Sequence, residues 1–299
     1  MLPHKSSSNQ RRVNRDGSGS VPSLALARGK PLSIRSGFTA LSFKPALFDD
    51  LMDPLVMVDH YTMTEPTFGA HPHAGMSAVT LLFEDSEGAF NNRDSLGNDI
   101  NLMPGDLYWL KAGIGAVHDE KPAPGAKAHG LQIFVNLPAK MKHDSPRSLH
   151  VKASEMPRLE SDGATVRVVL GESHGARGAS APALPITILD AAIKPGGQFQ
   201  YDVLPDHSQW IYTVRGEIEV GVGDKRIQMR EGEAVAAEAM TTALAMKLNA
   251  TVDSHVVIVM AKPVAETFVQ RGPFVMSNEA EIAQVEAAYR SGQLGRIVG

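Results

Sequence analysis

Short runs of β-branched and aromatic residues, each closed by Gly, Pro, Asn or Asp, recur along the chain and strongly limit the folds open to it. Such runs at close spacing are typical of strands in a β-sandwich or barrel, and patterns with a helical period are scarce. The clearest examples are SAVTLLFED, GLQIFVNL, ATVRVVLG, PITILDAAI, WIYTVRGEIEVGV and SHVVIVMA. The sequence therefore predicts an all-β protein.

The two halves of the chain resemble each other weakly. AVTLLFEDSEG leads to MPGDLYWLKAG in the first half, and QWIYTVRGEIEVG leads to REGEAVAAEAM in the second. Each half combines a strand, a turn, a strand and a Gly-acid step, which predicts two tandem β-barrel domains, at residues 31–171 and 186–299. The small, polar residues 172–185 between them are predicted to form a linker.

The two ends of the chain differ from this β-rich body. Residues 1–36 contain seven Lys or Arg and one Asp, and residues 1–30 are predicted to be a flexible basic N-terminal arm, either simply solvated or docking to an acidic partner. The arm lacks the apolar segment of a secretory signal, which favours a cytoplasmic location. Near the other end, SNEAEIAQVEAAYRSG predicts a short helix capped by Asn278 and Glu281 and ended by Gly292.

The composition excludes several kinds of site and partner. The chain has no Cys, so disulfides, iron–sulfur clusters and thiol nucleophiles are excluded, and any metal must be held by nitrogen and oxygen. A net charge of -4 gives no basic field for direct nucleic-acid binding. No apolar run reaches the ~18 residues of a membrane span.

Two compact pairs of potential metal ligands stand out. His71 and His73 lie one residue apart in FGAHPHAG, and His118 and Glu120 lie one residue apart in GAVHDE. In an extended strand, residues i and i+2 point to the same face, and Pro72 favours an extended backbone at His71. If the two strands are neighbours, the four side chains converge, and the sequence predicts one metal site.

Three imidazoles and one carboxylate contain the two-histidine, one-carboxylate set that suits Fe(II) and O₂ chemistry. Ligand type alone leaves Ni, Co, Mn, Cu(II) and catalytic Zn open, since all accept these donors. A single His-x-His pair is often incidental, but two such pairs within 50 residues, each beside a Gly-rich turn, favour a metal site.

Several longer motifs resemble those of the pirin family, two-domain members of the cupin superfamily. They are FGAHPHAGMSAVT, RDSLGND, MPGDLYWLKAGIGAVHDE, HGLQIFVNL and GPFVMSNEAEI, in family order. The resemblance implies a bicupin that binds one divalent metal per chain, usually iron, in its N-terminal domain through His71, His73, His118 and Glu120. Ala74 and Ser77 stand where many pirins have an arginine and a glutamate, which bears on the pocket entrance and on substrate preference.

The resemblance implies an enzyme, quercetin 2,3-dioxygenase, which opens a flavonol ring with O₂, with Glu120 as a general base. It equally allows a metal- or redox-sensing regulator that binds transcription or metabolic proteins, and a metal-dependent hydrolase is a third interpretation. The C-terminal domain is expected to hold no metal, because Ala245 and Lys247 take the places of His118 and Glu120.

Overall fold

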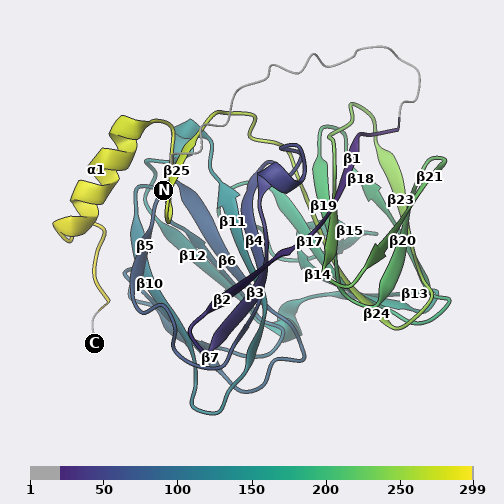
Figure 1. Cartoon of the computed structure of the whole chain (residues 1–299), viewed down its shortest axis with the longest axis horizontal. Coiled ribbons are helices and arrows are strands. Elements are labelled where there is room, and N and C mark those ends of the chain that lie inside the picture. The colour runs from purple at the N-terminus through teal and green to yellow at the C-terminus, as the bar shows by residue number, and fades with distance from the viewer. Residues whose placement is uncertain (1–20, 298–299) are drawn as a thin grey trace.

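The structure, a computed structural model, describes residues 21–297 and consists of two β-rich halves and a C-terminal helix (Figure 1). Each half contains a seven-stranded and a four-stranded antiparallel sheet. The predicted all-β class is therefore confirmed. None of the described helices has the length and apolarity needed to cross a membrane, and the cytoplasmic location stays a prediction.

The N-terminal half pairs its larger sheet in the order β12-β9-β6-β11-β4-β3-β2 and its smaller sheet in the order β5-β10-β7-β8. The larger sheet comprises β2 (Lys30–Ile34), β3 (Phe38–Phe43), β4 (Leu55–Met63), β6 (Met76–Leu82), β9 (Leu107–Lys111), β11 (Ala128–Asn136) and β12 (Arg147–Val151). The smaller sheet comprises β5 (His71–His73), β7 (Phe90–Asp94), β8 (Asp99–Leu102) and β10 (Ala116–Pro122).

The C-terminal half repeats this plan, with orders β1-β22-β19-β24-β17-β14-β13 and β18-β23-β20-β21. The larger sheet comprises β1 (Leu24–Arg28), β13 (Arg158–Ser161), β14 (Ala164–Leu170), β17 (Ile186–Ile193), β19 (Ser208–Arg215), β22 (Glu233–Ala237) and β24 (Ser254–Ala261). The smaller sheet comprises β18 (Gln198–Val203), β20 (Glu217–Val222), β21 (Lys225–Arg230) and β23 (Leu244–Ala250).

Short elements complete the chain. They are the strands β15 (Glu172–Ser173), β16 (Ala176–Arg177), β25 (Val269–Arg271) and β26 (Phe274–Met276), the 3₁₀ turns η1 (Pro45–Leu47), η2 (Ala139–Met141) and η3 (Ala153–Glu155), and the helix α1 (Glu279–Arg290). The predicted cap is confirmed, because Glu281 N donates to Asn278 Oδ1 at 3.0 Å and Gly292 follows the helix with a φ of 75°.

The strand pairing departs from the predicted domain boundaries in three places. Leu24–Arg28, predicted as part of the arm, pairs with β22, whereas residues 1–20 lie outside the described residues. Residues 158–170, predicted for the N-terminal domain, pair as β13 and β14 within the C-terminal sheet. After β24 the chain returns to the N-terminal half, where β25, β26 and α1 pack (Figure 1). The pairings of β1 with β22 and of β14 with β17 join residues distant in sequence, which local sequence patterns do not encode.

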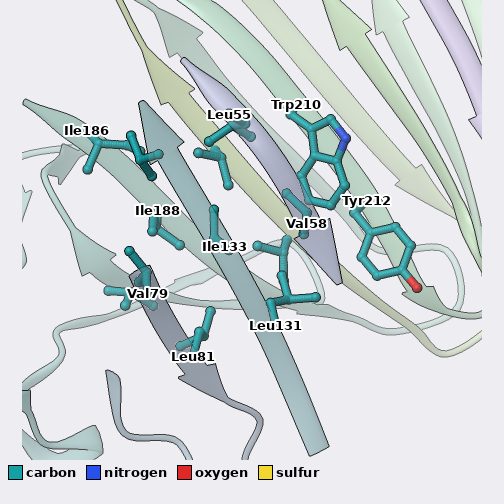
Figure 2. Packing of buried hydrophobic residues seen from close by; sticks show 14 of the residues in the cluster. Leu55, Val58, Val79, Leu81, Leu131, Ile133, Ile186, Ile188, Trp210 and Tyr212 are labelled. Atoms are coloured by element: carbon teal, nitrogen blue, oxygen red, sulfur yellow. The ribbon is translucent and has the colours of Figure 1, made fainter. Parts of the chain in front are cut away.

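The two seven-stranded sheets pack against each other through one apolar core. Figure 2 shows Leu131 and Ile133 of β11 beside Ile186 and Ile188 of β17 and Trp210 of β19. Alternate residues of the same strands face the other way, into the interior of each half. In the N-terminal half this inner face also carries polar residues, such as Thr80 and Gln132.

A series of hydrogen-bonded polar side chains crosses the interface between the two seven-stranded sheets. His129 Nδ1 lies 2.7 Å from Asp85 Oδ1, His60 Nε2 lies 2.7 Å from His129 Nε2, and Tyr212 OH lies 2.5 Å from His60 Nδ1. Because a carboxylate only accepts, neutral His129 must accept from His60, which in turn accepts from Tyr212. Burial, together with the nearby His129 and His255, lowers the pKa of His60 to about 3.

His60 should therefore make the fold sensitive to acid. Its folded pKa of about 3 lies below the unfolded value of about 6.5, so between these values the unfolded chain binds a proton that the folded chain does not. Stability is retained above pH 6.5 and falls as the pH drops, by up to about 1.4 kcal/mol per pH unit for this group. Urea unfolding from pH 7 to 4.5 should show a shallower loss in His60→Gln, and parallel profiles would contradict this account.

Candidate metal centre

Both predicted ligand pairs lie on neighbouring strands of the smaller N-terminal sheet. His71 and His73 form the ends of β5, and His118 and Glu120 lie on β10. The strands pair antiparallel with His118 opposite His71, which places the histidine side chains on one face. The extended backbone expected from Pro72 and the neighbouring placement of the two segments are both present.

Three imidazoles converge at this face. His118 Nε2 lies 3.0 Å from His73 Nε2 and 3.0 Å from His71 Nε2. The three side chains are a candidate group for one metal ion. His73 and His118 are almost fully buried, whereas His71 is partly exposed at the rim.

The protonation of these rings suits a cation. Burial lowers the pKa of all three histidines, to about 3 for His73, and neighbouring imidazoles add to the effect at His73 and His118. His71 Nδ1 lies 2.8 Å from the Gly69 carbonyl, which can only accept, so neutral His71 directs the lone pair of Nε2 toward the other rings. Neutral imidazoles whose Nε2 atoms converge on one point offer the nitrogen donors that a divalent transition metal prefers.

Glu120 lies beside this group but outside it. Its carboxylate Oε2 is 3.9 Å from His118 Nδ1, the ring nitrogen that faces away from the point where the Nε2 atoms converge. Thr80 Oγ1 of β6 donates to Glu120 Oε1 at 2.5 Å, and burial raises the pKa of Glu120 to about 7. Its assignment as a fourth ligand stays a prediction.

The C-terminal segment braces these strands from outside. Val117 of β10 and Ala74 pack against Phe274 of β26 and Ile282 of α1. Gly75 approaches the Val275 carbonyl so closely that a Cβ would lie 1.9 Å from its oxygen, so only glycine fits there. The buried Lys142 amine donates to the Gly75 and Val275 carbonyls, at 2.8 Å each, and ties the two segments together.

Two family models match the chain. The model described as "Pirin" matches residues 33–135, and the one described as "Pirin C-terminal cupin domain" matches residues 188–295. The Homo sapiens protein Pirin is 31% identical over 245 residues, which cover 82% of this chain and 83% of that protein. The chain belongs to the pirin family.

Other pirin-like proteins extend the comparison. A Pseudomonas aeruginosa protein named "Putative quercetin 2,3-dioxygenase" is 29% identical over 291 residues, 91% of this chain and 97% of that protein. The crystal structure of quercetin 2,3-dioxygenase from Acinetobacter baumannii superposes with a TM-score of 0.82 at 24% identity, over 93% of this chain and all of that one. A bacterial pirin from Escherichia coli in complex with nickel(II) gives a TM-score of 0.63 at 17% identity, over 81% of this chain and 100% of that one. These structures show the cupin fold.

The C-terminal half of this pirin has an apolar interior where the N-terminal half has ligands. β23 occupies the same place in its sheet as β10, and its inward residues are Met246 and Leu248. Ala245 and Lys247, predicted to replace the ligands, point outward instead, because the alignment of the Gly-acid steps did not fix the strand's parity. The inward residues Phe199 and Tyr201 of β18 likewise supply no imidazole or carboxylate.

Two clefts lie away from the histidines. One, of about 570 Å³, is lined by loops of the C-terminal half, including Asp162, Lys194 and Asp253. The other, of about 160 Å³, lies between the halves beside Phe83 and His255. Neither of these two clefts is lined by a histidine of the candidate metal centre.

Removing one central ligand should empty the centre. His118→Ala deletes the imidazole that touches both others, so metal content should fall several-fold, while the circular dichroism spectrum stays that of the wild type. His207→Ala is the matched control, because its ring contacts only a local carbonyl, that of Pro205. Full metal occupancy in His118→Ala, by elemental analysis of the purified proteins, would reject the ligand set.

The stoichiometry should be about one ion per chain. The inward face of the C-terminal smaller sheet carries Phe199, Tyr201, Met246 and Leu248, which cannot replace the histidine group. Titration of metal-free protein with Fe(II) or Ni(II) under argon should therefore show one tight site that His118→Ala abolishes. Two tight sites, one of which survives in His118→Ala, would contradict this asymmetry.

Proposed function

We propose that this pirin is a metal-dependent quercetin 2,3-dioxygenase that cleaves the central ring of a flavonol with O₂ and releases carbon monoxide. The observation that carries the proposal is the convergence of three neutral imidazoles beside a buried carboxylate, in a chain 29% identical to a protein named "Putative quercetin 2,3-dioxygenase". The proposed resident metal is Fe(II), and Ni(II) fits the same nitrogen donors.

His71, His73 and His118 would hold the metal, with Glu120 as the proposed fourth ligand. The metal supplies Lewis acidity toward the flavonol 3-hydroxyl and access to O₂ chemistry. The chain's own contribution is the exclusion of water and the control of one proton. Burial raises the pKa of Glu120 to about 7 in the absence of metal, so a Glu120 carboxylate whose bond to the metal loosens would be basic enough to accept the 3-hydroxyl proton near neutral pH.

Thr80 positions that carboxylate. Its hydroxyl donates to Glu120 Oε1 and leaves Oε2 free on the side of His118. This hydrogen bond favours the ionised form and opposes the effect of burial. Glu120 therefore remains able to exchange a proton and is held beside the three imidazoles.

A regulatory role is the second candidate, and it is favoured by the burial of the centre. His73 and His118 are only 1% and 2% exposed, and the C-terminal segment covers the strands that carry them. A shielded ion of this kind suits a redox sensor whose oxidation state changes affinity for a protein partner. Such a sensor needs a difference in free energy between two conformations, because an ion that interacts equally with both shifts nothing.

Turnover separates the two functions. Protein reconstituted with Fe(II) under argon and then mixed with quercetin and O₂ should consume them in equal amounts and release one carbon monoxide per flavonol. Glu120→Gln keeps the side-chain size but cannot accept the proton, so kcat should fall by about 100-fold or more. The metal content of each protein is measured in parallel, so that loss of ion is not mistaken for loss of the base.

Metal-loaded wild-type protein that neither binds nor consumes quercetin would reject the dioxygenase. The sensor would then be supported by a change in partner affinity between the Fe(II) and Fe(III) forms.

A further inference from the structure

Polar side chains line the inner face of the N-terminal half next to the histidines. In the larger sheet, the register places Gln132 of β11 opposite Thr80 of β6, and Thr80 donates to Glu120 across the interior. In the smaller sheet, Asn92 of β7 lies opposite Glu120 and therefore shares its face. Tyr61 of β4 belongs to the same interior, where its ring packs with apolar neighbours. Burial raises the pKa of its hydroxyl, and the nearby charge of Glu120 adds to this effect.

Three of these side chains hold buried polar atoms without a hydrogen-bond partner among the described residues. They are the Tyr61 hydroxyl, Asn92 Oδ1 and Gln132 Nε2. Asn92 Nδ2 can donate to the Tyr108 hydroxyl oxygen, which still accepts while its proton goes to Asp94. Proteins satisfy the great majority of such atoms, because an unpaired buried polar group costs free energy.

Exchanging the positions of Oε1 and Nε2 in the Gln132 side chain does not give both atoms a hydrogen-bond partner. The Thr80 hydroxyl has one proton and gives it to Glu120 at 2.5 Å, while Gln132 Oε1 lies 3.1 Å from the same oxygen. If the amide is turned, Nε2 can donate to Thr80, but Oε1 is then left without that contact. In either orientation one amide atom of Gln132 remains available.

Aromatic side chains share this interior. Phe38 stacks on Tyr61 with ring centroids 5.8 Å apart, and the Phe134 ring centroid lies 5.1 Å from that of His73. Gln132 and Phe134 lie on the inward face of a central strand, yet both residues are partly exposed. Unpartnered polar atoms and aromatic rings beside a candidate metal-ligand cluster suit a planar aromatic ligand that carries hydroxyl groups.

We propose that Tyr61, Asn92 and Gln132 form a specificity subsite that binds hydroxyl or carbonyl groups of a planar aromatic ligand remote from the group bound at the metal. The inference rests on the proposed dioxygenase function and deepens it. None of the three residues is a ligand of the metal group or accepts the substrate proton. Their role is to distinguish a polyhydroxylated flavonol from one that carries the 3-hydroxyl alone, because a site built to hydrogen-bond a hydroxyl rejects an analogue without it.

Two probes test the subsite by binding rather than turnover. Quercetin carries hydroxyl groups on both outer rings, and 3-hydroxyflavone carries only the hydroxyl on the central ring. Metal-loaded protein under argon should bind quercetin about tenfold or more tightly than 3-hydroxyflavone, measured by fluorescence titration. Tyr61→Phe and Gln132→Leu should each reduce that preference by about 2- to 10-fold, while the affinity for 3-hydroxyflavone stays within about twofold of wild type.

A second measurement concerns stability without ligand or metal. Tyr61→Phe removes an unpartnered hydroxyl, so its midpoint of thermal unfolding should equal or exceed that of the wild type. Tyr108→Phe is the matched control, because it removes a buried hydroxyl of the same interior that is bonded to Asp94, and it should lower the midpoint. Both variants keep the ring, so packing is preserved.

The outcomes separate this inference from the function on which it rests. Binding of neither flavonol by the wild type rejects the dioxygenase and the subsite together. Binding of both probes with a preference that survives unchanged in Tyr61→Phe and Gln132→Leu overturns the subsite alone. A lowered midpoint in ligand-free Tyr61→Phe, comparable to that of Tyr108→Phe, also overturns it, because the hydroxyl would then have a structural partner.

Discussion

The contact between the two seven-stranded sheets is the constraint on which the rest of the molecule depends. Burial of Trp210, Phe43 and the aliphatic residues around them supplies a large favourable term, because apolar surface removed from water contributes about 25 cal/mol per Å². The same contact turns the smaller sheet of each half outward. The metal strands therefore lie far from the shared core, at a surface where a third element can cover them.

Much of this plan could be predicted from the sequence because it is local. Alternating apolar runs identify the strands, Asn278 and Glu281 identify the helix start, and the His-x-His pair identifies a face of β5. The placement of β1 and β14 in the C-terminal sheet could not be predicted, because each pairs with residues distant in sequence. The position of Glu120 depends on a rotamer that Thr80 fixes, and no spacing rule reports it.

The interior polar residues show why part of the site escaped sequence analysis. Tyr61, Asn92 and Gln132 belong to separate strands, and each would be an ordinary strand residue on a solvated face. Only the pairing register shows that they turn inward beside Glu120. Their unpartnered atoms reduce stability where an apolar residue would not, and such exceptions concentrate at functional sites.

The return of the C-terminal segment to the N-terminal half has a consequence for biogenesis. The candidate metal ligands are synthesised well before Phe274 and Val275, which brace the strands that carry them. The nascent N-terminal half consequently emerges with its metal strands uncovered and without the Val275 carbonyl that Lys142 binds. Support of this group is thereby coupled to synthesis of the segment around Phe274, and a chain that stops before this segment would carry His71, His73 and His118 on unsupported strands.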